Sequence, residues 1–184
     1  MSGRRRLAAV EFPYSLGLPL AGAFVIAGLA LIAWRAPWYL LAPAAAAGLL
    51  SWTLVEYLLH RLVLHHVEPF RSWHVEHHRF PDVPMRIPLV YDVLLVAALV
   101  AVPALLIADR AFAGGVAFGL LVGHMAQEAT HHSLHCGSDG VRGGWFELRR
   151  REHDFHHHVN ERVAFGTVTS FWDRVFRTPA QAGR

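Results

Sequence analysis

Apolar residues gather in four runs, which lie over residues 16–34, 38–55, 87–108 and 111–126. Asp92 and His124 are the only charged or histidine residues within them. A helix needs about 20 mostly apolar residues to cross the hydrocarbon core of a bilayer. We therefore expect an all-α fold with four transmembrane spans, over about residues 16–34, 38–59, 87–108 and 111–130.

The polar segments of the chain lie between the second and third runs and after the fourth. Residues 60–86 and 131–184 hold most of the charged side chains and most of the histidines. A chain of 184 residues is long enough for one domain. We expect a single domain over 1–184, an integral membrane bundle whose polar segments form a cytoplasmic helical cap. In the fourth span Gly115, Gly119 and Gly123 predict close packing against a neighbouring helix.

The positions of the basic residues predict the orientation in the membrane. With the N-terminus in the cytoplasm, 15 of the 17 arginines fall on the cytoplasmic side, and only Arg35 and Arg110 lie outside. This is the positive-inside bias, and it also places the C-terminus in the cytoplasm, with a bacterial inner membrane as the expected location.

The first run follows three arginines but is too long for the apolar part of a signal peptide, so we expect a retained anchor. The excess of basic residues therefore reflects the topology in the membrane, and we expect no nucleic-acid partner. The lone Cys136 excludes an intrachain disulfide.

Fourteen histidines occur in the chain, none of them before residue 60. Ten form four short boxes: His60 and His65; His74, His77 and His78; His131 and His135; His153, His156 and His157. Positions i, i+3 and i+4 of a helix share one face, so we expect each HxxHH box to direct three imidazoles to one point. The HxxxxH spacing turns roughly 140° on a regular helix, which predicts a distortion there or ligands to different ions.

The inferred topology places all four boxes on the cytoplasmic side. Imidazole is the commonest protein metal ligand, and ten imidazoles are too many for one ion and enough for two. We therefore predict two metal ions bound by the box histidines. A solvated or pH-sensing histidine patch is the alternative, which four boxes on one face disfavour. Glu56 and Glu128 lie on the same helix faces as His60 and His131, where a carboxylate can accept a hydrogen bond from a bound imidazole.

Four histidines lie outside the boxes: His66, His124, His132 and His158. His124 lies within the fourth span, and ionisable residues inside a membrane are functional candidates. We expect the other three to be exposed neighbours of the boxes.

The boxes and the C-terminal segment resemble the fatty acid hydroxylase and sterol desaturase superfamily of membrane enzymes. The matching stretches are Glu56 to His65, Trp73 to Pro81, Glu128 to His135, His153 to His157, Phe165 to Thr167 and Phe171 to Phe176. The resemblance covers about residues 40–178 and implies a four-helix membrane bundle with a dimetal site, in which all ten box histidines are ligands and catalytic residues. It also implies a carboxylate three residues before the third box, where the fatty acid 2-hydroxylases have Asp and this chain has Glu128. The eight residues between His65 and His74 form a shorter gap than in those enzymes and resemble the spacing of carotenoid hydroxylases.

The same resemblance implies an O2-dependent non-haem di-iron hydroxylase that inserts a hydroxyl group into a C–H bond of a lipid. A fatty acyl chain is the expected substrate, with a sterol or carotenoid as alternatives. Iron is the expected metal, although zinc binds such sites readily in a purified sample. An external electron donor is required, such as a cytochrome b5-like protein, a ferredoxin or a reductase. A desaturase with the same ligands and a non-enzymatic metal-binding or transport protein are the competing hypotheses. The boxes lie at helix ends rather than near the bilayer midplane, which counts against transport.

Overall fold

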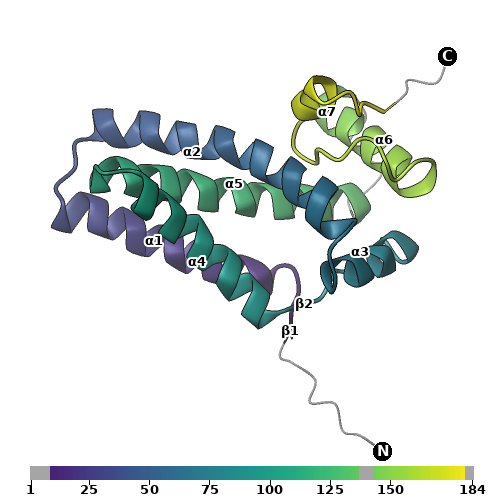
Figure 1. Cartoon of the computed structure of the whole chain (residues 1–184), viewed down its shortest axis with the longest axis horizontal. Helices are drawn as coiled ribbons and strands as arrows, with labels where there is room; N and C mark the ends of the chain where they lie inside the picture. Colours follow the sequence, from purple (N-terminus) through teal and green to yellow (C-terminus); the bar gives the residue numbers. More distant parts are fainter. Residues whose placement is uncertain (1–8, 137–142, 181–184) are drawn as a thin grey trace, which may run out of the picture.

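A computed structural model of the chain describes residues 9–136 and 143–180. Four long helices lie side by side, and three shorter helices gather at one end of them (Figure 1). The long helices are α1 (Gly17–Gly28, which irregular turns extend to Tyr14–Ala33), α2 (Trp38–Leu58), α4 (Leu89–Leu106) and α5 (Arg110–Cys136). The shorter helices are α3 (Phe70–Arg79), α6 (Gly144–His158) and α7 (Phe171–Val175).

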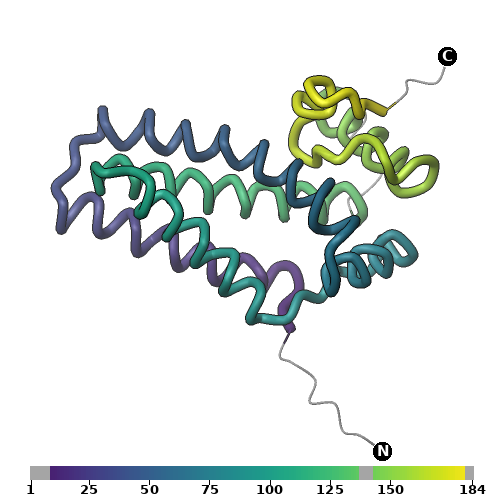
Figure 2. Tube along the Cα trace, viewed as in Figure 1, coloured from purple at the N-terminus to yellow at the C-terminus, as the bar shows by residue number. Residues whose placement is uncertain are grey.

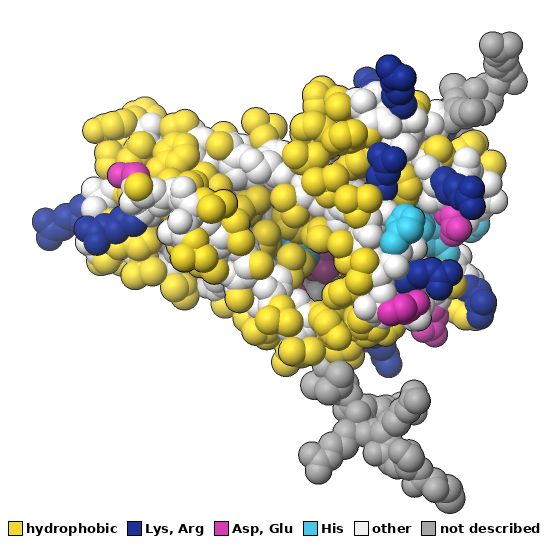
Figure 3. Space-filling model, in the orientation of Figure 1, with side chains coloured by type: hydrophobic (Ala, Val, Ile, Leu, Met, Phe, Trp, Pro, Cys, Tyr) yellow, Lys and Arg dark blue, Asp and Glu magenta, His cyan; other side chains and the backbone are white. Residues whose placement is uncertain are grey.

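Three of the long helical segments are long and apolar enough to cross a membrane. With the irregular turns that extend the first two, they cover Tyr14–Ala33, Trp38–Leu64 and Leu89–Leu106. Their outward faces are apolar, with Phe24 at 70% exposed, Ile32 at 80% and Leu105 at 82%. Apolar side chains cover the long helices in Figure 3, while charged side chains gather at their two ends. This distribution is typical of helices that face lipid, and the first three predicted spans agree with these segments to within a few residues.

Helix α5 lies at the centre of the bundle and contacts α1, α2 and α4. It is long enough to span a membrane but is less apolar than the other three, because it contains several glycines as well as His124 and Gln127. A helix covered by three neighbours meets protein rather than lipid on most of its surface. Its composition therefore reflects helix packing, and membrane hydropathy alone does not identify it.

Glycine allows α5 to approach α2 closely. A Cβ atom at Gly119 would lie 2.0 Å from the main-chain oxygen of Ala45, and one at Gly123 would lie 2.6 Å from Cβ of Trp52. Neither distance leaves room for a side chain. The close packing predicted from the glycine spacing is confirmed, and it brings the C-terminal end of α5 beside that of α2.

The helix that begins as α2 does not end at Leu58 but continues as a π-helical turn over Leu59–Leu64. This turn contains His60 and is followed directly by His65. A π-helix closes hydrogen bonds five residues apart, so it brings residues with an i, i+5 spacing toward a common face. The distortion predicted from the HxxxxH spacing is present.

A two-stranded ladder joins the beginning of the described chain to the segment before α4. Strand β1 (Ala9–Val10) pairs antiparallel with β2 (Ile87–Pro88), and Val10 lies opposite Ile87. The all-α prediction did not include this ladder, and it placed residues 87 and 88 in a span that begins at Leu89 instead. Strands of two residues are too short to show an alternating pattern in the sequence.

The C-terminal part of the chain folds back onto the end of α2, as the tube in Figure 2 shows. Helix α7 contacts α2, and α6 contacts α5. Tyr57 is fully buried between these elements, with its hydroxyl 2.9 Å from Oγ1 of Thr178. Helices α6 and α7 are thereby held against the end of the bundle at which the histidine boxes lie.

Candidate metal centre

All ten box histidines come together at this end of the bundle, in two sets of five. The first histidine group consists of His60, His65, His74, His78 and His156. The second histidine group consists of His77, His131, His135, His153 and His157. Within each group the candidate ligand nitrogens all lie within 4.8 Å of one another, so each group could hold a metal ion.

Each HxxHH box is divided between the two groups. Its first and third histidines, four residues apart, belong to one group, and its middle histidine belongs to the other. The outer pair of α3 belongs to the first group, and the outer pair of α6 belongs to the second. The expectation that each such box directs three imidazoles to one point is therefore wrong. Residues i+3 and i+4 are adjacent and differ by about 100° around a helix, which is enough to direct them to different points.

The nitrogens of the first histidine group fit a bound cation better than a hydrogen-bond network. Nε2 of His74 lies 3.0 Å from Nε2 of His60, 3.1 Å from that of His65 and 3.0 Å from that of His78. A neutral imidazole carries one N–H, so one nitrogen cannot satisfy three such contacts with hydrogen bonds. Lone pairs directed to a common point are what a metal ion requires.

Burial keeps the imidazoles of α3 in the form that binds metals. Burial, and after it the neighbouring imidazoles, lowers the pKa of His77 and that of His78 to about 3. The pKa of His74 is lowered in the same direction, again chiefly by burial. At neutral pH these rings are uncharged and can each offer a lone pair to an ion.

Two main-chain carbonyl groups orient imidazoles of the first histidine group. The Nδ1–H of His60 donates to the carbonyl oxygen of Phe165 at 2.5 Å, and that of His156 donates to the carbonyl oxygen of Val163 at 2.7 Å. A proton fixed on Nδ1 leaves the lone pair on Nε2, which faces the centre of the group. Contacts of this kind fix the tautomer and the ring orientation of metal-binding histidines.

The segment that carries these carbonyl groups is itself held by two buried carboxylates. Asp173 accepts hydrogen bonds from the backbone N–H groups of Phe165 and Gly166, each at 2.9 Å. Glu56 accepts from the backbone N–H groups of Thr167 and Val168. The C-terminal segment is therefore fixed from its own helix α7 and from α2. The sequence did not identify Asp173 as a site residue, because its contacts with this segment are with main-chain atoms.

The two predicted carboxylates do not act on the histidines beside them in the chain. The hydrogen bonds of Glu56 go to the C-terminal segment rather than to His60, so its contact with that imidazole is indirect. Glu128 lines a cavity next to His131, and its Oε2 atom has no hydrogen-bond partner among the described residues. Both residues lie near the site, as their helix faces predicted, but the partners of Glu56 are backbone N–H groups rather than the predicted imidazole.

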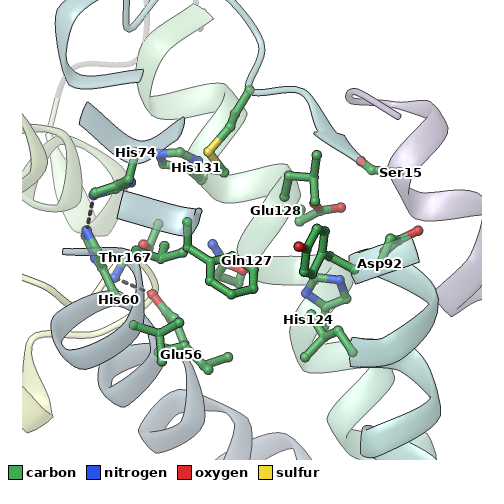
Figure 4. Close-up of a pocket in the computed structure, with 18 of the residues that line it drawn as sticks. Ser15, Glu56, His60, His74, Asp92, His124, Gln127, Glu128, His131 and Thr167 are labelled. Carbon is green, nitrogen blue, oxygen red and sulfur yellow. Dashed lines mark hydrogen bonds between the residues drawn. The ribbon is translucent and has the colours of Figure 1, made fainter. Parts of the chain in front are cut away.

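A cavity of about 480 Å³ adjoins both histidine groups. His60 and His74 of the first group and His131 of the second form part of its wall, and the rest is mostly apolar. In Figure 3 the surface is hollowed between apolar side chains, and acidic and histidine atoms are visible inside. Figure 4 shows the three box histidines at one end of this cavity, with His124 and Glu128 at the other. A flexible apolar molecule entering the cavity would reach both groups.

The four other histidines lie outside the two groups. His124 is buried and its ring lies 4.9 Å from that of Trp52, measured between centroids. His66 and His158 are exposed, and the ring of His132 stacks on Phe12. His124 therefore faces the interior of the bundle, as expected of a functional candidate, and belongs to the cavity rather than to the metal centre.

Comparison with known proteins gives a consistent result. The family model described as fatty acid hydroxylase matches residues 45–178, which is most of the chain. The chain belongs to the fatty acid hydroxylase family. The fatty acid 2-hydroxylase of Rattus norvegicus is 34% identical to it over 149 residues, which cover 71% of this chain and 38% of that protein. The dihydroceramide fatty acyl 2-hydroxylase FAH2 of Arabidopsis thaliana is 32% identical over 144 residues, covering 72% of this chain and 59% of that protein.

The fold of this fatty acid hydroxylase family member is also found in a solved structure. Full-length scs7p, in which only the hydroxylase domain is visible, superposes with a TM-score of 0.68 at 23% sequence identity. The match covers 91% of this chain and 68% of that one. The chain thus spans well under two thirds of the length of the two curated relatives, but nearly all of it shares the hydroxylase fold.

Proposed function

We propose that the protein is a membrane enzyme that uses O2 to insert a hydroxyl group into a C–H bond of a lipid, with a fatty acyl chain as the substrate. The observation that carries this proposal is the shared wall between the apolar cavity and both histidine groups. An alkyl chain in that cavity would lie against the two places where metal ions can bind. The names of the relatives, which are fatty acid and ceramide hydroxylases, support the same chemistry.

In this proposal the ten box histidines hold two metal ions, one in each histidine group, and both ions are iron. Bound iron supplies the activation of O2 that hydroxylation of an unactivated C–H bond requires. The residues of the chain do the remaining work. The two carbonyl groups at Val163 and Phe165 hold imidazoles in the binding tautomer, and Asp173 and Glu56 hold the segment that carries those carbonyl groups. The apolar wall of the cavity aligns the alkyl chain and excludes water.

The proposal includes a topology in the membrane. Helix α5 is the fourth span, and α3, α6 and α7 form a cap on the cytoplasmic side, which the arginine distribution favours for both termini. The whole chain acts as one domain, because the histidines of each group come from the bundle and from the cap together. Electrons come from an external donor that approaches the cap. The relatives named above are eukaryotic, and the bacterial inner membrane stays a prediction.

Metal content and lipid products test this proposal together. Elemental analysis of the purified protein is expected to give about two ions per chain, and fewer after His74→Ala in the first group or His77→Ala in the second. His66→Ala and His158→Ala are matched controls, because both side chains are exposed and belong to neither group.

Lipid extracts from cells producing the protein should contain acyl chains one oxygen heavier, and the two group variants should abolish them. Products lighter by two hydrogens would assign desaturation instead. A metal content unaffected by both group variants would rule out a dimetal site formed by these histidines.

A further inference from the structure

The end of the cavity farther from the box histidines contains polar groups that the metal centre does not use. Asp92 of α4 and His124 and Glu128 of α5 line this end, and the ring of Trp52 of α2, which also lines the cavity, lies 4.9 Å from that of His124. Figure 4 shows His124, Asp92 and Glu128 around it, across the cavity from His60 and His74. Apart from the three box histidines and Ser15, Glu56, Tyr91, Gln127 and Thr167, the remaining lining residues are apolar.

Several of these polar atoms are buried without a partner. Both ring nitrogens of His124 and the indole Nε1 of Trp52 have no hydrogen-bond partner among the described residues, and neither does Oε2 of Glu128. His124 is only 6% exposed and Trp52 only 2%. A buried polar group without a hydrogen bond costs about 1–3 kcal/mol, so such groups are rare unless a ligand or water completes them.

We propose that His124 and Trp52, with Glu128 beside them, form a subsite for a neutral hydrogen-bonding group of the lipid substrate, namely a hydroxyl or an amide. The proposal rests on the lipid hydroxylase function stated above and adds the kind of group that the lipid carries. The indole N–H is a donor, the carboxyl group can accept, and a neutral imidazole offers one donor and one acceptor. A hydroxyl or amide group matches this mixture because it both donates and accepts.

The charges around the cavity argue against an anionic group at this end. The described residues that line the cavity include no Arg or Lys, whereas Glu56, Asp92 and Glu128 are among them. A carboxylate or phosphate would therefore be buried without a cation to pair with, at a large cost in free energy. A neutral group avoids that cost while satisfying the unpartnered atoms.

The position of the subsite also limits which carbon can react. His131 follows His124 by seven positions in α5, which corresponds to roughly 10 Å along the helix axis. A lipid whose polar group binds at His124 therefore presents to the histidine groups a C–H bond several bonds away from that group. The subsite thus fixes the depth at which the chain enters the cavity.

The proposal is tested by equilibrium binding of radiolabelled dodecan-1-ol and dodecane to the full-length protein in nanodiscs, corrected for partition into empty nanodiscs. The wild type is expected to bind the alcohol about tenfold more tightly than the alkane, since one satisfied buried group is worth about 1.4 kcal/mol. Unlabelled dodecanoate should compete less well than the unlabelled alcohol.

His124→Phe removes both nitrogens and is expected to bring the ratio of the two affinities close to one, whereas His124→Gln keeps a donor and an acceptor and should retain the preference. Metal content measured on the same samples shows that the variants are folded. Equal affinities of the wild type for the alcohol and the alkane would overturn the proposal, as would an unchanged preference in a metal-loaded His124→Phe protein. A protein with the preference but no hydroxylated lipid product would retain the subsite and lose the proposed function.

Discussion

Replacing Asp173 by Asn should weaken metal binding by the first histidine group, although none of the five histidines of that group is changed. The carboxylate of Asp173 is 1% exposed and accepts three hydrogen bonds of 2.9 Å, from the backbone N–H groups of Phe165 and Gly166 and from the hydroxyl of Thr178. Asn keeps one oxygen acceptor and replaces the other oxygen with an NH₂ group, which faces a backbone donor. Loss of one hydrogen bond to a charged group in a buried site costs about 2 kcal/mol of folding free energy.

That loss should appear both in thermal stability and in metal binding. For a chain of this size, 2 kcal/mol lowers the unfolding midpoint by roughly 4–8 °C. The carbonyl groups of Val163 and Phe165 lie in the loosened segment, so the imidazoles of His156 and His60 lose their fixed orientation. Disturbing such outer contacts lowers metal affinity by about 10–100-fold. At limiting metal, the content should fall below about two ions per chain.

The assay is elemental analysis of detergent-purified protein dialysed against a fixed low concentration of iron, combined with thermal unfolding of the same samples. Asp154→Asn is the matched control, because it makes the same chemical change at an exposed position on α6 next to His153. If Asp173→Asn and Asp154→Asn have the same midpoint and the same metal content, the C-terminal segment does not position the first histidine group.

Three further perturbations have expected outcomes. Gly119→Ala places a Cβ atom 2.0 Å from a main-chain oxygen of α2 and should lower stability by about 1–3 kcal/mol in detergent unfolding titrations, whereas Gly28→Ala, with nothing within 4 Å, should not. Tyr57→Phe removes a buried hydroxyl that lies 2.9 Å from Oγ1 of Thr178 and should cost about 1 kcal/mol, measured against Tyr39→Phe, whose ring is 67% exposed. Chelation of bound metal should lower the thermal midpoint, because an ion that binds only the folded state stabilises it; an unchanged midpoint would mean that the fold does not depend on metal.

The sequence predicted the long helices and the members of the site better than the contacts within it. Long apolar runs mark α1, α2 and α4, because their outer faces are apolar as well as most of their inner ones. The HxxxxH spacing of His60 and His65 predicted a distorted helix, since a regular turn would separate the two side chains. All ten box histidines lie in one of the two compact groups, as expected from their gathering in four boxes.

The contacts that the sequence did not predict involve main-chain atoms or depend on how the helices are placed relative to one another. Each HxxHH box is divided between the two groups because of where α3 and α6 lie relative to each other. The spacing of histidines along a single helix does not contain this information. The partners of His60 and His156 are main-chain carbonyl groups, which every residue possesses. Glu56 was assigned to the imidazole one turn away, but its carboxylate reaches backbone N–H groups more than a hundred residues later in the chain.

The division of the boxes makes the two groups interdependent. Because α3 and α6 each give a pair of imidazoles to one group and a single imidazole to the other, neither set of five is complete unless both helices are in place. A bound ion would therefore act as a crosslink between parts of the chain as distant as His65 and His156, and would remove the conformational entropy of a long loop from the partly unfolded protein. Binding of the first ion would hold in place the helices that the second requires, so the apo protein is expected to take up its two ions cooperatively.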